Sequence, residues 1–171
     1  MQFLILLLAA VASVNNAFMR QTTPSTKLSS FSLKSTNDNI DIAKSFMATN
    51  FACDNPSLLD DEFTCDSPFF DGLSKDKYLK GLSMESKAIY AAIPDYDRCA
   101  NGYTIDEMNP DRVWFRVRPK GTILGEFKVK GEVYPPNQKS FQLPAQQMSV
   151  TIKDGKVSIF FVLFVCFGLY T

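Results

Sequence analysis

Histidine is absent from the 171 residues of this sequence. Without an imidazole, the chain cannot form a Ser-His or Cys-His pair or a His-Asp base, and it has no imidazole to bind a metal ion. Any activity that begins with removal of a proton from carbon therefore has to use an Asp or Glu side chain as its base.

Regularly spaced cysteines are also lacking. The four cysteines are Cys53, Cys65, Cys99 and Cys166, and no two of them form a Cys-x-x-Cys pair. This spacing argues against a zinc site, and a core of the expected size does not need a disulfide framework. We therefore expect free or partly buried thiols, and we expect neither a metal nor a cofactor.

Clusters of basic residues are missing as well. The formal net charge is +0, and the only charged side chains in residues 1 to 37 are Arg20, Lys27 and Lys34. The remainder of the chain carries 15 basic and 18 acidic side chains, because those three cations are subtracted from 18. A mildly acidic body without a basic stripe argues against nucleic acid as a partner, since phosphate binding needs clustered Lys and Arg.

The N-terminal apolar run, residues 3 to 14, is too short to span a bilayer. Residues 1 to 17 have the pattern of a cleavable signal peptide, and residues 18 to 38, rich in Ser and Thr, have that of a transit peptide, which we expect to be disordered. Phe18 directly after Ala17 resembles the junction in the plastid presequences of diatoms and related algae. We expect import into a plastid through the secretory pathway, with secretion as the alternative.

The body of the chain begins near residue 39 and is long enough for one domain, with 46% hydrophobic residues. Apolar spacing predicts a first helix over about 39 to 52 and a longer one from 75 to 92, with Ser74 as its N-cap and Pro94 as its stop. Glu85 falls on the apolar stripe of the second helix. Its carboxyl either enters a polar cavity or reaches past the edge of the stripe, and the edge is favoured.

The sequence after Pro94 has the pattern of strands. Extended segments are predicted at 102 to 108, 112 to 119, 125 to 134 and 141 to 152, and an Asp-Gly turn leads into a last strand from Val157 to about Phe161. In the second of these strands, Val113, Phe115 and Val117 alternate with Trp114, Arg116 and Arg118. Helices followed by an antiparallel meander predict an α+β fold with the helices on one face of a curved sheet.

Four stretches in this order resemble the nuclear transport factor 2-like superfamily, in particular its SnoaL-like branch. They are "LLDDEFTCDSPFFDGLSKDKYL", "AIPDY", "VWFRVRPKGTILGEF" and "VTIKDGKV". The similarity covers roughly residues 39 to 157, and "LPAQQMSVTIKDGKV" is similar to plastid-targeted algal members. The resemblance implies a cone-shaped, cystatin-like fold with an apolar cavity between the helices and a curved antiparallel sheet.

Members of this superfamily act as isomerases, dehydratases and polyketide cyclases, or as binding and assembly modules, so the fold does not decide the function. Two hypotheses follow from the resemblance. The first is a domain that binds a small apolar molecule, with lyase or isomerase activity through a carboxylate base. The second is a non-catalytic interaction module that forms a homodimer, or docks onto a partner, through the open face of the sheet.

The candidate site residues come from the same resemblance. Asp66 matches the family's Asp before Pro and is the candidate catalytic base; its alternative is a carboxylate that accepts N–H groups of the turn around Pro68. The candidate ligand-binding residues are Tyr78, Tyr96, Trp114 and Arg116. The tyrosines could equally be core residues, and Arg116 could lie on the outer face beside an acid.

The tail, residues 158 to 171, departs from the family pattern because both alternation sets of "VSIFFVLFVCFGLYT" are apolar. A strand with one solvated face should alternate. We therefore expect an atypical or truncated last strand, and the alternatives for the tail are weak membrane association, an oligomer-burying strand or an artefact of gene prediction.

Overall fold

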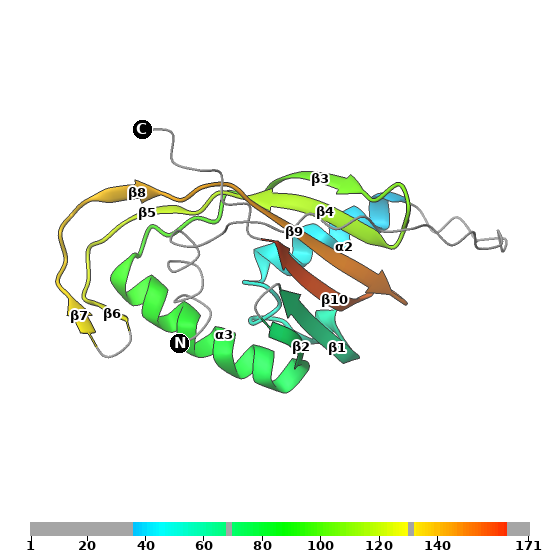
Figure 1. The fold of residues 1–171 in the computed structure, drawn as a ribbon, viewed down its shortest axis with the longest axis horizontal. Helices are drawn as coiled ribbons and strands as arrows, with labels where there is room; N and C mark the ends of the chain where they lie inside the picture. The colour runs from blue at the N-terminus through cyan, green and yellow to red at the C-terminus, as the bar shows by residue number, and fades with distance from the viewer. Residues whose placement is uncertain (1–35, 68–69, 130–131, 164–171) are drawn as a thin grey trace, which may run out of the picture.

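The computed structural model describes residues 36–67, 70–129 and 132–163 (Figure 1). The predicted signal peptide and almost all of the predicted transit segment fall outside these ranges, so plastid targeting stays a prediction. Residues 164–171 of the apolar tail also lie outside the described residues.

Two α-helices and a short 3-10 helix precede most of the sheet. Helix α2 spans Thr36–Ala48, the 3-10 turn η1 spans Pro56–Leu58 and helix α3 spans Lys75–Ala92. Helix α3 begins after Ser74 and ends before Pro94, as predicted, whereas α2 begins earlier and ends earlier than the predicted 39 to 52. No helix in the described part of the chain combines the length and apolarity needed to cross a membrane.

A six-stranded curved sheet forms the other layer, in the order β2-β1-β10-β9-β4-β3 (Figure 1). The strands are β1 Leu59–Ser67, β2 Phe70–Ser74, β3 Asn101–Ile105, β4 Arg112–Val117, β9 Gln146–Lys153 and β10 Lys156–Leu163. Four of the five neighbouring pairs are antiparallel, as predicted, but β1 runs parallel to β10. The sheet is therefore mixed, with its first long strand paired to its last.

A narrow arm extends from the sheet and curves past the end of α3 (Figure 1). In it β5 Lys120–Thr122 pairs with β8 Ser140–Gln142, and β6 Phe127–Val129 pairs with β7 Glu132–Tyr134. The arm is tied to α3 where the N–H groups of Leu124 and Gly125 donate to the carbonyl of Ala92, at 2.9 and 2.8 Å. The sequence predicted one strand over 125 to 134, where the structure has the β6–β7 hairpin.

The predicted strand from 141 to 152 is divided into β8 and β9. Pro144 lies between them, and because a proline has no N–H to donate to a ladder, it interrupts the pairing. Strand β9 then pairs with both β4 and β10, at the middle of the main sheet.

The core lies between the two helices and the inner face of the sheet. Val113, Phe115 and Val117 are buried, which confirms the predicted alternation in β4. Aromatic rings from separate elements meet here: the ring of Phe160 on β10 lies 5.1 Å from that of Phe46 on α2 and 6.1 Å from that of Tyr78 on α3. Helices and sheet thus share a main core, and a second small cluster of Ile89, Ala92 and Ile93 packs the end of α3 against the arm.

Strand β10 accounts for part of the unusual tail. It continues to Leu163, beyond the predicted end near Phe161, and lies between β1 and β9. Val157, Phe160 and Val162 are buried in the core, whereas Ile159 and Leu163 are each 36% exposed on the other face. The described part of the tail is therefore a central strand with one buried and one partly exposed apolar face.

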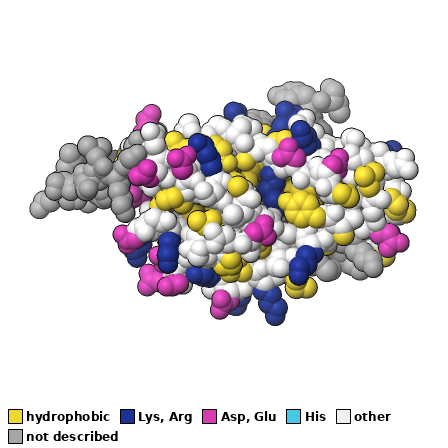
Figure 2. Space-filling view, turned by 180° about the vertical axis from the view of Figure 1, so that it is seen from behind, with side chains coloured by type: hydrophobic (Ala, Val, Ile, Leu, Met, Phe, Trp, Pro, Cys, Tyr) yellow, Lys and Arg dark blue, Asp and Glu magenta, His cyan; other side chains and the backbone are white. Residues whose placement is uncertain are grey.

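The surface opposite to the view of Figure 1 carries basic and acidic side chains that are interspersed rather than gathered by sign (Figure 2). Exposed pairs such as Lys44 with Asp41, at 3.0 Å, add little to stability because water screens them. This face has mixed character, with apolar side chains scattered between the charges.

Two glycines without close neighbours allow a matched test of the backbone. Gly155 has φ +80 in the Asp-Gly turn between β9 and β10, and Gly81 lies within α3; a Cβ at either would meet no atom within 4 Å. Gly155→Ala should destabilise the protein by about 1–2 kcal/mol, because an L-residue is strained at this φ. Gly81→Ala should stabilise it by about 0.5–1 kcal/mol, because alanine loses less entropy in a helix.

Urea unfolding at neutral pH measures both changes in the free energy of unfolding. Equal stability of Gly155→Ala and wild type would contradict the left-handed turn, and a loss of stability in Gly81→Ala would contradict the ordinary helical setting of Gly81.

Candidate functional site

A small inner cavity of about 70 Å³ lies between α3 and the inner face of the sheet. Most of its wall is aliphatic or aromatic, contributed by α3, β9, β10 and the end of β4. The side chains with polar groups that line it are Tyr78, Glu85, Tyr96, Arg98 and Gln146. An apolar enclosure with a few polar groups has the lining of a small-molecule site, and its volume, below the roughly 300–1,000 Å³ of most ligand pockets, has room for only part of a larger ligand.

Glu85 lines this cavity from α3, on the stripe that also holds Leu82 and Ile89. Its Oε2 atom is buried and has no hydrogen-bond partner among the described residues. Burial raises the pKa of the Glu85 carboxyl to about 7, and the positive charge of Arg98 opposes this rise. The favoured prediction that Glu85 reaches past the edge of the stripe is therefore wrong. The carboxyl faces a cavity, as the alternative stated, but this cavity is mostly apolar rather than polar.

Gln146 contributes a second polar atom without a partner. Its Oε1 is buried, faces no hydrogen-bond donor among the described residues, and belongs to a side chain that lines the same cavity. Sequence reasoning missed Gln146, although the alternation of Gln146, Met148 and Val150 along β9 could have placed it on the inner face. Two buried polar atoms without a partner among the described residues therefore line one cavity.

The two predicted tyrosines both line the cavity. Tyr78 is fully buried, and its hydroxyl donates to the carbonyl of Phe51 at 3.0 Å. Tyr96 lies at the boundary of the cavity, and burial raises its pKa to about 12. Its hydroxyl therefore stays protonated near neutral pH and can act as a hydrogen-bond donor.

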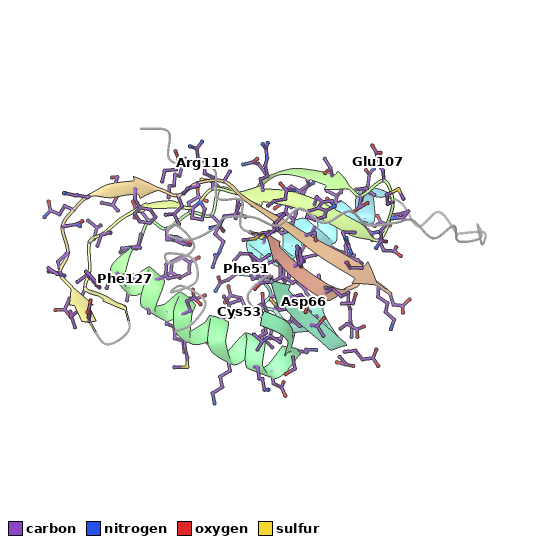
Figure 3. The ribbon with its side chains drawn as sticks, viewed as in Figure 1. Phe51, Cys53, Asp66, Glu107, Arg118 and Phe127 are labelled. Atoms are coloured by element: carbon purple, nitrogen blue, oxygen red, sulfur yellow. The ribbon has the colours of Figure 1, made fainter. Side chains whose placement is uncertain are left out.

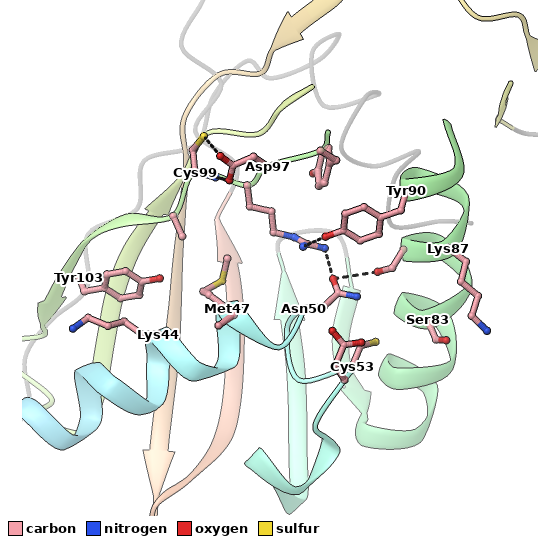
Figure 4. A pocket seen from close by; sticks show the side chains of 16 residues that line it. Lys44, Met47, Asn50, Cys53, Ser83, Lys87, Tyr90, Asp97, Cys99 and Tyr103 are labelled. Carbon is pink, nitrogen blue, oxygen red and sulfur yellow. Dashed lines mark hydrogen bonds between the residues drawn. The ribbon is translucent and has the colours of Figure 1, made fainter. Parts of the chain in front are cut away.

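Arg98 lies in the irregular segment between α3 and β3 and lines the cavity beside Tyr96. Its Nη2 donates to Oδ1 of Asn50 at 2.6 Å and its Nη1 to the hydroxyl of Tyr90 at 3.0 Å (Figure 4). The guanidinium also lies over the ring of Phe51, 4.4 Å from its centroid. Sequence reasoning missed Arg98, because a residue outside helices and strands carries no periodic signal.

A left-handed turn after α2 supplies two of these contacts. Asn50, Phe51 and Ala52 have φ values of 55, 56 and 63, although none is glycine. This conformation costs about 1–2 kcal/mol per residue, so neighbouring groups must hold it. The Tyr78 hydroxyl on the Phe51 carbonyl and the N–H of Ala52 on the carbonyl of Phe46, at 3.1 Å, both do so.

A larger outer cleft of about 770 Å³ adjoins the cavity between α2 and α3 (Figure 4). Arg98 and Tyr96 line both spaces. The other charged side chains of the cleft are Lys44 from α2, Lys87 from α3, Asp54 and Asp97. The site is therefore an open polar cleft that leads to a small apolar cavity.

Neither a protein-family model nor a curated protein matches the sequence. Solved structures do match: AclR of Streptomyces galilaeus, a candidate hydroxylase, has a TM-score of 0.57 and 17% identity over 75% of this chain and 90% of its own. IdmH of Streptomyces antibioticus, a candidate polyketide cyclase, has a TM-score of 0.56 and 14% identity over 73% and 90%. A candidate SnoaL-like polyketide cyclase of Jannaschia sp. CCS1 has a TM-score of 0.53 and 13% identity, over 74% of this chain and 85% of its own.

The chain has the SnoaL-like fold. The fold class predicted from the sequence, α+β and nuclear transport factor 2-like, is thereby confirmed. At these identities the likeness concerns the fold alone, and what the site does has to be argued from its own residues.

Asp66 does not line the cavity of this SnoaL-like fold. It lies on β1 between the buried residues Cys65 and Ser67, so its side chain leaves from the other face of the strand (Figure 3). Its Oδ1 accepts the N–H of Gly72 at 2.8 Å. This is the turn contact that the sequence offered as the alternative to catalysis, and the carboxylate beside the cavity is Glu85 instead.

Trp114 and Arg116 also lie away from the cavity, because the alternation of β4 places them opposite the buried Val113, Phe115 and Val117. Trp114 donates from Nε1 to Oδ2 of Asp106 at 2.8 Å, and the side chain of Arg116 is exposed. Of the five predicted site residues, the structure therefore brings only Tyr78 and Tyr96 together at the cavity.

The cysteines of the described chain, Cys53, Cys65 and Cys99, are free. Burial raises the pKa of all three thiols, most strongly that of Cys65, and the neighbouring Asp97 adds to the effect at Cys99. Because the thiolate is the reactive form, none of these side chains has the setting of an activated nucleophile. Glu85 remains the group best placed for proton transfer.

The buried carboxyl predicts a specific pH dependence of stability. Burial raises the pKa of Glu85 from its ordinary value of 4.5 to about 7, so the folded protein keeps this proton where the unfolded chain loses it. Wild-type stability should therefore fall as pH rises through this window. Glu85→Gln removes the titration, so its stability relative to wild type should increase by about 2–3 kcal/mol between pH 4.5 and pH 8.

Urea unfolding at both pH values measures this difference. Glu107→Gln is the matched control, because it makes the same substitution at an exposed position. A pH trend for Glu85→Gln that equals the trend for Glu107→Gln would contradict the buried carboxyl.

Proposed function

We propose that the cavity binds a small, largely apolar carbonyl compound and that the Glu85 carboxylate removes a proton from the carbon next to the carbonyl. The observation that carries this proposal is the buried, unpartnered Glu85 oxygen in an apolar cavity. The SnoaL-like fold supports it, since two of the similar structures are candidate polyketide cyclases.

The raised pKa suits the carboxyl for this role. A base is most effective when its pKa lies near the working pH, because it is then both ionised in part and strong enough to take the proton. A pKa of about 7 meets both conditions, whereas an ordinary carboxyl is a much weaker base. Burial is the cause of this raised pKa, so the apolar side chains of the cavity wall contribute to the basicity of Glu85.

The proton and electron pair can be followed through the step. Glu85 takes the proton, the C–H electron pair forms a carbon–carbon double bond, and the carbonyl oxygen becomes an enolate. The protonated Tyr96 hydroxyl lines the same cavity and can stabilise that oxygen. Return of the proton to another carbon is an isomerisation, and loss of a leaving group is a lyase reaction.

Exchange of carbon-bound hydrogen for deuterium tests the proton-abstraction step without knowledge of the natural substrate. With cyclopentanone in D₂O, followed by proton NMR, the wild type should accelerate exchange over buffer. Glu85→Gln should lower this acceleration by about 100-fold or more, because the base is lost. The wild-type rate should rise as pH passes through about 7, when Glu85 becomes ionised.

Asp66→Asn is the control for this experiment, since Asp66 lies outside the cavity wall. It should exchange at the wild-type rate. Equal rates for wild type and Glu85→Gln would remove Glu85 as the base, and loss of exchange in Asp66→Asn alone would return the role to Asp66.

A second candidate function is assembly through the outer face of the sheet. On this face the exposed Ile159 and Leu163 of β10 lie beside Thr151 and Gln147 of β9. A partly exposed apolar row on the outer face of the sheet suits a second copy of the same chain, in an isologous dimer. This use of the outer face is compatible with a binding site on the inner face.

Sedimentation equilibrium measures assembly directly. The wild type should sediment as a dimer and Ile159→Lys as a folded monomer, because a charge on this row would be buried without a partner. Thr104→Lys, on the same face at the edge strand β3, is the control and should leave the dimer intact. A wild type that sediments as a monomer would contradict the assembly function.

A further inference from the structure

Arg98 separates the outer cleft from the inner cavity, because it lines both. Its guanidinium is held from three sides: by Asn50 in the left-handed turn at 2.6 Å, by Tyr90 on α3 at 3.0 Å and by the ring of Phe51 at 4.4 Å (Figure 4). The ring centroid of Tyr96 lies 5.5 Å from it. A side chain fixed in this way is already arranged for a ligand.

The charge of Arg98 is not neutralised by these contacts. Both hydrogen-bond acceptors are neutral, an amide oxygen and a phenol oxygen, and no carboxylate in the described ranges lies within 4.0 Å of its guanidinium. A guanidinium has five N–H donors in a planar fork, and these contacts engage two of them. A half-buried cation with unused donors is set to bind an anion.

The charges of the outer cleft favour the same kind of ligand. Lys44, which also pairs with Asp41 at 3.0 Å, and Lys87 line it on the two helix walls, together with Arg98 (Figure 4). Of its two acids, Asp97 already accepts the N–H of Cys99 at 2.8 Å and lies 3.7 Å from Lys120. The cleft therefore has more basic than acidic side chains, while the cavity behind Arg98 is mostly apolar.

We propose that Arg98 binds the carboxylate of a ligand whose apolar part enters the inner cavity toward Glu85, so the substrate class is that of small apolar carboxylic acids. A carboxylate is favoured because its planar oxygens match the guanidinium fork. The reaction assigned to this ligand rests on the proposed function, but its binding does not, because Arg98 and Glu85 contribute different contacts.

Trans-cinnamate and cinnamamide test this inference, because they have the same apolar body and differ in the charge of one group. Isothermal titration calorimetry should show that the wild type binds cinnamate at least about 10-fold more tightly than cinnamamide, as expected for a charge-assisted contact. Arg98→Gln should lose this preference, and Arg98→Lys should keep part of it, because lysine retains the charge but not the fork.

Arg118→Gln is the matched control, since Arg118 is exposed and lines neither the cleft nor the cavity. It should keep the preference for cinnamate. Thermal unfolding identifies any variant that does not fold. If Arg98→Gln is unfolded, NMR of the Arg98 Nε–H group in the wild type replaces it as the test. This signal should shift when cinnamate is added but not when cinnamamide is added.

Equal affinity of the wild type for cinnamate and cinnamamide, or no binding of either, overturns the inference. A preference that persists in folded Arg98→Gln, or an Arg98 signal that does not move with cinnamate, also overturns it. Glu85→Gln separates the two proposals: if it loses ketone exchange but keeps the preference for cinnamate, both stand. If wild type shows no ketone exchange but prefers cinnamate through Arg98, only the base role of Glu85 fails.

Discussion

The hydrogen bond from the Tyr78 hydroxyl to the Phe51 carbonyl holds the turn on which the site depends. Three consecutive residues of this turn are left-handed, at a cost of about 1–2 kcal/mol each. One buried hydrogen bond contributes only about 0.5–1.5 kcal/mol net, so the Ala52 N–H bond to the Phe46 carbonyl and the packing of the Phe51 ring must supply the rest. The turn places Asn50 against Arg98 and Phe51 in the cavity wall. These contacts connect α2, α3 and the sheet at one point.

The burial of Glu85 is costly for the fold and gives the site its reactivity. An ionised carboxylate in an apolar wall loses hydration, and the charge of Arg98 only partly offsets this loss. A leucine at this position of α3 would pack without such a cost. The presence of an acid with an unpartnered oxygen beside an unpartnered Gln146 oxygen is therefore better explained by a ligand than by stability.

Features determined by neighbouring residues could be predicted, and those determined by tertiary contacts could not. The end of α3 follows from Pro94, and the turn into β10 follows from an Asp-Gly pair. Ser74 precedes the helix as predicted, but its side chain makes no capping hydrogen bond. The apolar stripe of α3 predicted the side of the helix on which Glu85 lies, but not whether its carboxyl faces a cavity or solvent. Arg98 lies outside helices and strands, so no periodic pattern could predict its position. Asp66 matched a family motif, but its carboxylate accepts the N–H of Gly72 in a turn.

The protonation state of Glu85 decides whether this carboxyl can act as a base at neutral pH. Carbon-13 NMR of the Glu85 carboxyl across pH 3 to 9, assigned by comparison with Glu85→Gln, gives its pKa in the folded protein. A carboxyl that burial keeps protonated titrates with a midpoint near 7, and this is the expected result. A midpoint at the ordinary value of an exposed glutamate would show that Glu85 is not held in an apolar wall.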